Sequence, residues 1–251
     1  MLTFLFVTAI LLQSAHSAAT SRGKGDIAYL ESLVSKLPAG FLNIESQYIW
    51  VSEEYRWPDN TVPYVIADDA TFTADELEKI EACFEDIRTL TCVNIVERTT
   101  ETQYLTLTNT YDGCFATGGY YKGYNETTLN LGAGCFYLGK AVPIHEFMHV
   151  LGFGHEQIRF DRDLYVRIVW KNILAGTEGN FFKTSRLAMY PKYPYDFSSV
   201  MQYPLWGFSI NSNDTMEVLP GVDPGIDQDL IGEVLEMSTT DIARINTAYK
   251  C

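Results

Sequence analysis

Apolar and polar positions along the first half of the chain follow two different periods. From Thr73 to Leu90 apolar residues recur at three- and four-residue steps, which predicts a helix with one buried face. Thr73 and Glu76 have the spacing of a capping box at the start of this helix. Short apolar stretches bounded by Gly, Asn or Asp predict strands at 62–66, 93–96, 104–107 and 127–131.

The second half of the chain has a weaker pattern. Regular strand signals fade after residue 155, and residues 239–249 predict a closing helix. The order of elements indicates an α/β (α+β) fold with a twisted sheet in the N-terminal half and an irregular C-terminal half. We expect a cleft near residue 156, between these two subdomains.

The first residues are typical of a secretory signal peptide. An apolar run from Leu2 to Leu12 passes into small residues, which predicts a signal peptide at 1–18. The alternative is a membrane anchor, but this run is too short to span a bilayer. Residues 19–48 carry few core signals and are interpreted as a propeptide, so the folded domain is expected at 49–251.

Composition narrows the possible partners and the compartment. The net charge of −14 argues against nucleic acid and anionic membranes. Five cysteines behind a signal peptide indicate disulfides in a secreted protein, although they leave several pairings open. Asn125 and Asn213 each begin a glycosylation sequon, so we expect a glycoprotein.

Residues 145–155 read H-E-x-x-H-x-x-G-x-x-H. On a helix, His145 and His149 stand one turn apart on the same face, so both imidazoles can bind one metal ion. Gly152 can adopt a positive φ and turn the chain so that His155 points back toward them. Three neutral imidazoles with open positions suit catalytic zinc, one ion per chain.

An amphipathic helix that carries two histidines by chance is the alternative for the first part of this motif. The chain has only four histidines, and His16 lies in the expected signal peptide. Every histidine of the expected mature protein therefore belongs to the motif. The sequence thus predicts zinc hydrolase chemistry, in which Glu146 acts as general base and then as general acid.

The match extends beyond the third histidine. Residues 152–163 read G-F-G-H-E-x-x-R-x-D-R-D, and residues 195–203 read Y-D-F-S-S-V-M-Q-Y. Together with Trp57-Pro58, Val62-Pro63-Tyr64 and the stretch 91–96, these runs resemble the astacin family of metzincin peptidases. The resemblance covers residue 50 to the end of the chain. Gln202 departs from it, since many members have histidine there, but this position is not a metal ligand.

The resemblance implies a two-lobed catalytic domain with a mostly parallel sheet, in a secreted zinc endopeptidase that acts on proteins or peptides. We also expect a monomer. It implies that Met201 forms the floor of the zinc site in a methionine-bearing turn. Tyr203 is expected to bind the zinc ion at rest and to stabilise the oxyanion when substrate binds.

Disulfide pairing is also implied by the resemblance rather than by the residues themselves. It pairs Cys92 with Cys251 and Cys114 with Cys135. Cys83 is then left over, and its place on the apolar face of the first helix favours a buried free thiol over an intermolecular link.

Latency and activation follow from the resemblance in part. It suggests that a propeptide aspartate occupies the zinc, and Asp26 follows Gly25 as that pattern requires, although Gly23 stands where phenylalanine is expected. The mature amino terminus is expected to pair with Glu156. No lysine or arginine lies between Lys36 and Arg56, so a trypsin-like cleavage site is absent there.

Two other function classes fit parts of the sequence. A secreted binding protein or toxin-like module could keep the fold without catalysis, but it would normally lack Glu146 or a ligand, and all are present. A three-histidine zinc site could also hydrolyse substrates other than peptides. For peptide substrates, the resemblance places the pocket for the residue after the scissile bond around and after Tyr203. No Lys or Arg lies between Lys192 and Arg244, so we expect small or neutral residues there, because an acidic side chain would be desolvated without a partner.

Overall fold

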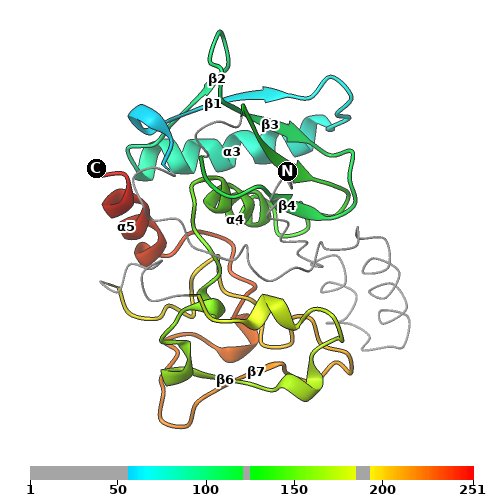
Figure 1. The fold of residues 1–251 in the computed structure, drawn as a ribbon, viewed down its shortest axis with the longest axis vertical. Helices are drawn as coiled ribbons and strands as arrows, with labels where there is room; N and C mark the ends of the chain where they lie inside the picture. Colours follow the sequence, from blue (N-terminus) through cyan, green and yellow to red (C-terminus); the bar gives the residue numbers. More distant parts are fainter. Residues whose placement is uncertain (1–55, 121–124, 185–192) are drawn as a thin grey trace.

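The structure is a computed structural model that describes residues 56–120, 125–184 and 193–251. The expected signal peptide, the propeptide and Asp26 lie outside these described residues. Figure 1 shows an upper lobe that contains the larger sheet, and a lower lobe built mainly of loops. The predicted fold class, with a sheet-bearing N-terminal half and an irregular C-terminal half, is confirmed.

Most helices and strands lie in the first half of the described chain. The α-helices are α3 (Ala74–Leu90), α4 (Ala141–Val150) and α5 (Thr239–Ala248). The strands are β1 (Thr61–Ile66), β2 (Asn94–Glu97), β3 (Tyr104–Thr108), β4 (Cys114–Ala116), β5 (Glu126–Leu131), β6 (Val166–Ile168) and β7 (Met216–Val218). Short 3-10 helices cover Pro58–Asn60, Glu156–Ile158, Arg162–Leu164, Trp170–Asn172, Glu178–Phe181 and Gln228–Leu230.

The upper sheet has the strand order β2-β1-β3-β5-β4. Strands β2, β1, β3 and β5 are parallel, and β4 runs antiparallel to β5 at the edge. Helix α3 connects the parallel neighbours β1 and β2, as a crossover helix does. The sheet is therefore mostly parallel, as the resemblance implied.

Helix α3 begins where its sequence predicts. The Thr73 hydroxyl accepts a hydrogen bond from the Glu76 amide at 3.3 Å, and the Glu76 carboxylate accepts one from the Thr73 amide at 2.8 Å. This capping box satisfies amides that have no partner inside the helix. The apolar face of α3 buries Ile80, Cys83, Phe84 and Ile87. Cys83 is a buried free thiol, as predicted, and burial raises its pKa strongly.

Helix α4 packs against α3 on the same side of the sheet (Figure 1). The rings of Phe84 and Phe147 meet there, with their centroids 5.4 Å apart. Every residue of α4 is buried, the polar His145, Glu146 and His149 included. The two histidines and the glutamate of the motif are thus held in a rigid, dehydrated element.

Three strands were missed by the sequence pattern. Strands β4, β6 and β7 have three residues each, too few for alternation to be recognised. The antiparallel pair β6 and β7 lies in the lower lobe, beside a second hydrophobic cluster. That cluster includes Val166, Phe181, Tyr195, Tyr203 and Met216.

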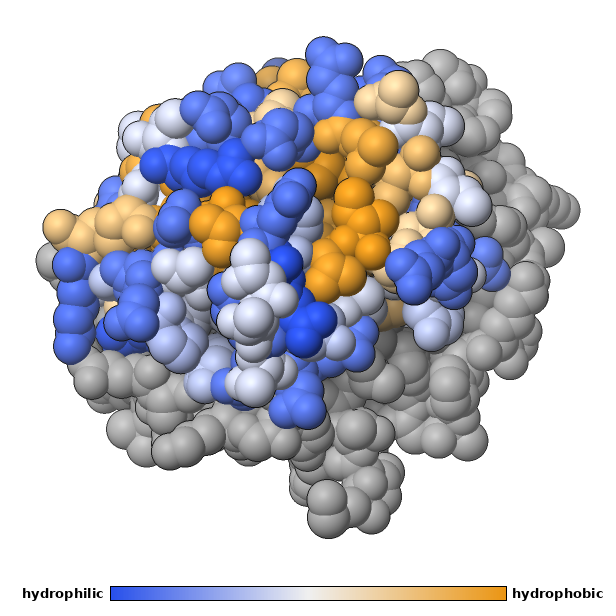
Figure 2. Space-filling view, turned by 90° about the horizontal axis from the view of Figure 1, so that it is seen from above, coloured by the Kyte–Doolittle hydropathy of each residue, from blue (hydrophilic) through white to orange (hydrophobic). Residues whose placement is uncertain are grey.

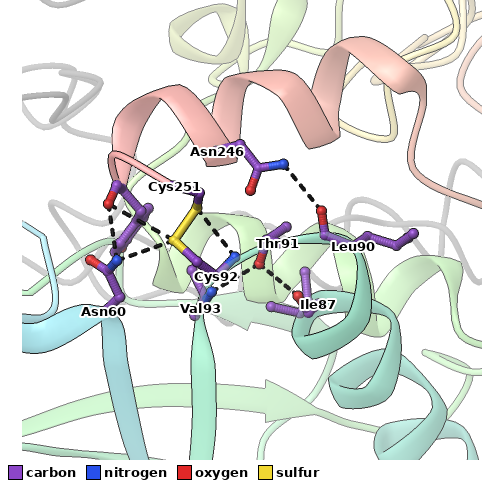
Figure 3. The surroundings of a disulfide bond; sticks show 9 residues. Asn60, Ile87, Leu90, Thr91, Cys92, Val93, Asn246 and Cys251 are labelled. Atoms are coloured by element: carbon purple, nitrogen blue, oxygen red, sulfur yellow. Dashed lines mark hydrogen bonds between the residues drawn. A yellow bond between two sulfur atoms is a disulfide. The ribbon is translucent and has the colours of Figure 1, made fainter.

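Helix α5 closes the chain against the upper lobe. Its capping box pairs Ser238 with Asp241. Figure 3 shows the Cys92–Cys251 disulfide next to this helix, with the Asn246 amide donating to the carbonyl of Leu90 at 3.1 Å. The second disulfide joins Cys114 of β4 to Cys135. Both disulfides have the pairing that the resemblance implied.

The surface of the upper lobe is mixed. From above, apolar residues gather near the middle of this face, among hydrophilic ones (Figure 2). Among the residues that the structure describes, none of the helices combines the length and the hydrophobicity needed to cross a lipid bilayer.

Candidate metal centre and active site

Three histidine rings converge on one point between the lobes. The Nε2 atoms of His145 and His149 lie 3.1 Å apart, and the Nε2 atom of His155 lies 3.2 Å from each of them. All three side chains are buried. Within the described ranges, this is the only group of three or more His, Cys, Asp or Glu side chains close enough to hold a metal ion.

Gly152 brings the third histidine into place. Its φ is +94°, and it ends α4 with two hydrogen bonds, from its own amide to the His149 carbonyl and from the Phe153 amide to the Met148 carbonyl. This pair of bonds is the Schellman motif, which requires a left-handed residue at this position. The turn that was predicted at Gly152 is therefore present, and His155 follows it in extended conformation.

Backbone carbonyls fix the orientation of two of the rings. His145 Nδ1 lies 2.5 Å from the carbonyl oxygen of Val200, and His149 Nδ1 lies 2.7 Å from that of Phe153. A carbonyl oxygen only accepts, so each Nδ1 carries the proton and each Nε2 presents a lone pair. Such partners orient metal-binding histidines and raise their basicity.

The electrostatics of the site keep these rings neutral. Burial lowers the pKa of His149 to about 4. Burial also lowers the pKa values of His145 and His155 well below the usual value, and the neighbouring histidines lower them further. Neutral imidazole is the form that binds a metal ion.

The donor set fits zinc. Three nitrogens bound tetrahedrally at about 2.0–2.1 Å from one zinc ion lie about 3.3 Å apart. The observed separations of 3.1 to 3.2 Å are close to that value. The three lone pairs point at one another, which is unfavourable unless a cation lies among them.

Glu146 and Tyr203 bring oxygen atoms to the same site. Both oxygens of the Glu146 carboxylate and the Tyr203 hydroxyl are buried, and none of them has a hydrogen-bond partner among the described residues. Burial raises the pKa of Glu146 well above its usual value, and burial together with Glu146 raises the pKa of Tyr203. The centroid of the Tyr203 ring lies 4.3 Å from that of the His155 ring. Buried polar atoms without partners need an explanation, and a ligand in this site supplies one.

Residues 199–203 form the turn below the histidines. Met201 is 1% exposed, and its carbonyl accepts a hydrogen bond from the Glu156 amide at 2.9 Å. The side chain of Gln202 accepts from the Tyr195 hydroxyl at 2.6 Å and donates to the Tyr203 carbonyl at 2.8 Å. Gln202 is therefore not part of the metal site but braces the turn, a role that its sequence position did not reveal.

Glu156, which follows the third histidine, lies in a buried ion-pair network. Arg244 donates to both of its carboxylate oxygens at 2.8 Å, and Arg159 donates to one at 3.2 Å. The amide of Asp196 donates to the same carboxylate at 2.8 Å. Sequence reasoning missed Arg244, which comes from α5. The mature amino terminus, the partner implied by the resemblance, involves residues outside the described range.

The other charged residues after the motif pair locally. Arg159 binds the Asp161 carboxylate at 2.8 Å, and Arg162 binds that of Asp163 at 2.7 Å. Both arginine side chains are buried. Among the described residues, the salt bridges of both arginines lie within this run.

A pocket adjoins the histidines on the side of α4 and the turn. It is lined by Leu138, Ala141, Val142, His145, Val200, Gln202, Tyr203, Pro204, Gly232 and Val234. Apart from His145, none of these described lining residues carries an ionisable nitrogen or a carboxylate. The pocket is thus a largely apolar recess directly beside the metal site.

Comparison with known sequences gives consistent matches. The family model described as "Astacin", a peptidase family, matches residues 50–250. Zinc metalloproteinase nas-6 of Caenorhabditis elegans is 33% identical over 229 residues, which cover 91% of this chain and 62% of that protein. High choriolytic enzyme 1 of Oryzias latipes is 38% identical over 193 residues, which cover 76% of this chain and 66% of that protein.

The human meprin A subunit beta is 35% identical over 80% of this chain, but the match covers only 27% of that protein. The chain thus spans less than two thirds of the length of each of these three curated relatives. Among solved structures, high choriolytic enzyme 1 from medaka, described as a hatching enzyme zinc-protease, matches with a TM-score of 0.66 and 34% identity. That match covers 82% of this chain and 96% of the solved chain.

Proposed function

The chain belongs to the astacin family of peptidases, and on this basis we propose that it is a secreted zinc-dependent endopeptidase with one zinc ion per chain. The observation that carries the proposal is the convergence of three buried Nε2 atoms within 3.2 Å of one another. Beside them lie oxygens of Glu146 and Tyr203 that have no hydrogen-bond partner among the described residues. These are the groups that metal-assisted peptide hydrolysis requires.

The histidines hold the metal ion and the other two groups handle the proton and the charge. A zinc ion bound by His145, His149 and His155 supplies acidification of a water molecule and polarisation of the scissile carbonyl. Glu146 accepts the proton of the attacking water at a carboxylate oxygen and later gives it to the leaving amine. Glu146 is completely buried, so bulk water does not compete for the proton between the two steps.

Tyr203 stabilises the negative charge that develops on the substrate carbonyl oxygen. Its hydroxyl is buried and unpartnered within the described part of the chain, so it is free to donate to the carbonyl oxygen of a bound substrate. The Gln202 side chain donates a hydrogen bond to the Tyr203 carbonyl at 2.8 Å, and the Tyr203 amide donates one to the Gln157 side chain at 3.4 Å. Met201 acts as a packed floor and not as a ligand.

The apolar pocket beside His145 is proposed to hold the substrate residue that follows the scissile bond. An aspartate or glutamate in this pocket would lose its hydration and find no cation among the described lining residues, which costs several kcal/mol. Small or neutral side chains avoid this penalty. Cleavage-site profiling on a digested proteome tests the proposal, and a majority of Asp or Glu directly after the cut would contradict it.

Secretion, latency and glycosylation form the remaining part of the proposal. Residues 1–18 act as signal peptide and 19–48 as propeptide, with Asp26 on the zinc in the latent form. The sequon residues Asn125 and Asn213 are both exposed, as glycan attachment requires. Expression of the full chain, followed by N-terminal sequencing and deglycosylation of the secreted product, tests these points. An Asp26→Ala chain that is as inactive as the unaltered zymogen would rule out the latency role.

The decisive test of the enzymatic proposal is an activity assay on a peptide library. Activity should appear after removal of the propeptide, disappear with a chelator and return with added zinc. A folded, zinc-loaded and trimmed protein that cleaves no peptide would instead favour the catalytically silent binding module on the same fold.

A further inference from the structure

The C-terminal helix α5 reaches all three chain segments that carry or orient the histidines. Asp241 contacts the turn that orients His145, Arg244 contacts the residue after His155, and Tyr249 contacts the end of α4. Asp241 and Arg244 are three positions apart and therefore lie on the same side of the helix. None of these three residues was singled out as a site residue by the sequence.

Asp241 is linked to His145 through a single peptide unit. The carbonyl oxygen of Val200, which accepts from His145 Nδ1, belongs to the same peptide unit as the amide of Met201. That amide donates to the Ser199 hydroxyl at 3.1 Å, and the hydroxyl donates to Asp241 at 2.6 Å.

The other carboxylate oxygen of Asp241 accepts the Val200 amide at 3.0 Å. Asp241 is completely buried, so these bonds have no competition from water. The direction of the carbonyl that orients His145 is thus set by this carboxylate.

Arg244 is linked to His155 through Glu156. Its guanidinium binds the Glu156 carboxylate with two parallel hydrogen bonds of 2.8 Å, and it also donates to the carbonyl of Pro194 at 3.0 Å. Such a two-pronged contact fixes direction as well as distance. Glu156 directly follows His155 in the chain, so the backbone angles that aim the His155 ring depend on where this carboxylate is held.

Helix α5 is itself anchored at its C-terminal end. The Tyr249 hydroxyl donates to the carbonyl of Leu151 at 3.0 Å, at the end of the helix that carries His149. The disulfide between Cys92 and Cys251 ties the following residues to the start of β2 (Figure 3). The helix is therefore a rigid support and not a loosely packed end.

We propose that Asp241 and Arg244 are positioning residues of the metal site, the first for His145 through Val200 and the second for His155 through Glu156. Neither residue touches the metal ion or the substrate. Both determine how well two of the three imidazoles are aimed, so they set the affinity for the ion and the geometry around it. The inference rests on the proposed zinc site.

The test compares the zinc-binding strength of full-length secreted variants by competition with a chromophoric chelator. Asp241→Asn places a side-chain amide among hydrogen-bond donors, and Arg244→Gln removes the two parallel hydrogen bonds to Glu156. Each variant should therefore bind zinc about tenfold or more weakly, which is the size of effect typical of residues that orient metal ligands. Arg244→Lys keeps the positive charge but cannot form both parallel hydrogen bonds, so its zinc affinity should lie between that of Arg244→Gln and that of the unaltered protein.

Cobalt substitution provides a readout that mere loss of stability does not change. Ligand-field absorption bands of bound Co²⁺ report ligand geometry, so the bands of Asp241→Asn and Arg244→Gln should differ from those of the unaltered protein. Ile245→Ala is the matched control, since Ile245 is fully buried on the same helix but takes no part in either route. It should lower the melting temperature and leave zinc affinity within about twofold and the cobalt bands unchanged.

The outcomes separate this inference from the proposed function. Unchanged zinc affinity and cobalt bands in folded Asp241→Asn and Arg244→Gln would overturn the positioning role while the zinc site stands. A loss of zinc affinity in Ile245→Ala as large as that in the other two variants would also overturn the positioning role, since general destabilisation would then explain the effect. If Asp241→Asn does not fold, Ser199→Ala and Arg244→Lys decide the matter by the same measurements. Failure of the unaltered protein to bind zinc would overturn the proposed function and this inference together.

Discussion

A Cβ atom placed on Gly232 would lie 2.1 Å from the backbone nitrogen of Pro204. It would also lie 2.5 Å from the Tyr203 carbonyl carbon, so the two backbones are in direct contact. Gly232 has a φ of +81°, a conformation that other residues rarely adopt. This contact joins the loop after residue 231 to the turn that carries Tyr203. Gly232, Tyr203 and Pro204 all line the pocket beside His145.

Gly232→Ala should therefore be strongly destabilising and should also reduce peptidase activity, because the Tyr203–Pro204 backbone must move. Gly221→Ala is the matched control, since Gly221 has a similar φ of +83° but open space around its Cβ position. We expect the control to lose only about 1 to 2 kcal/mol from the left-handed conformation. Thermal unfolding of both variants measures the difference, and equal losses would show that the close contact is not required.

Glu146→Gln should abolish peptide hydrolysis while zinc remains bound. The amide cannot accept the proton of the attacking water, and loss of such a group lowers rates by about 10²- to 10⁴-fold. Zinc content by atomic absorption should stay at one ion per chain, because the side chain is not a ligand. Retention of more than about a tenth of the kcat would show that another group acts as base.

Tyr203→Phe removes only the hydroxyl, which lacks a partner among the described residues. If it stabilises the developing oxyanion, kcat should fall about 10²- to 10³-fold with KM nearly unchanged. The ring contact with His155 is kept, so the fold should be preserved. A rise in KM at constant kcat would instead indicate a role in ground-state binding.

Val234→Arg should shift specificity toward acidic residues after the scissile bond. Val234 lines the pocket, so a guanidinium there offers the partner that Asp or Glu otherwise lacks. Leu235→Arg is the control, because Leu235 is 58% exposed and is not among the lining residues. Two peptides that differ only in Asp or Ala at this position should change their kcat/KM ratio about tenfold or more in Val234→Arg and little in Leu235→Arg.

The pH dependence of stability should carry a contribution from Asp241. Burial raises the pKa of this carboxyl to about 6, against the effect of its hydrogen-bond donors and of Arg244, which lower it. Because the pKa is higher in the folded state than in the unfolded chain, the stabilising contribution is complete below about pH 4 and is lost as pH rises through about 6.

Asp241→Asn does not titrate and should lack this decline. The free energy of unfolding of the unaltered protein minus that of Asp241→Asn should fall by roughly 3 kcal/mol between about pH 4 and pH 7. Denaturant unfolding at a series of pH values measures this difference, since contributions from all other groups cancel. A difference that is constant with pH would show that Asp241 has an unshifted pKa.

Local features were determined by the sequence alone. The spacing of His145 and His149 places them one helical turn apart wherever the helix lies, and Thr73 with Glu76 marks a helix start without reference to the rest of the chain. The turn at Gly152 was also predictable from the sequence, because glycine can adopt a positive φ wherever it lies in the fold. Such interactions span few residues, so spacing in the sequence fixes them.

Partners that are distant in the chain were decided by the tertiary structure. The carbonyl of Val200 meets His145 across 55 positions, and Arg244 meets Glu156 across 88. No pattern marks such a carbonyl or arginine, because any polar group that the chain path brings into a buried site can serve. The same reason explains why the bracing role of Gln202 and the close contact of Gly232 with Pro204 emerged only from the folded path of the C-terminal lobe.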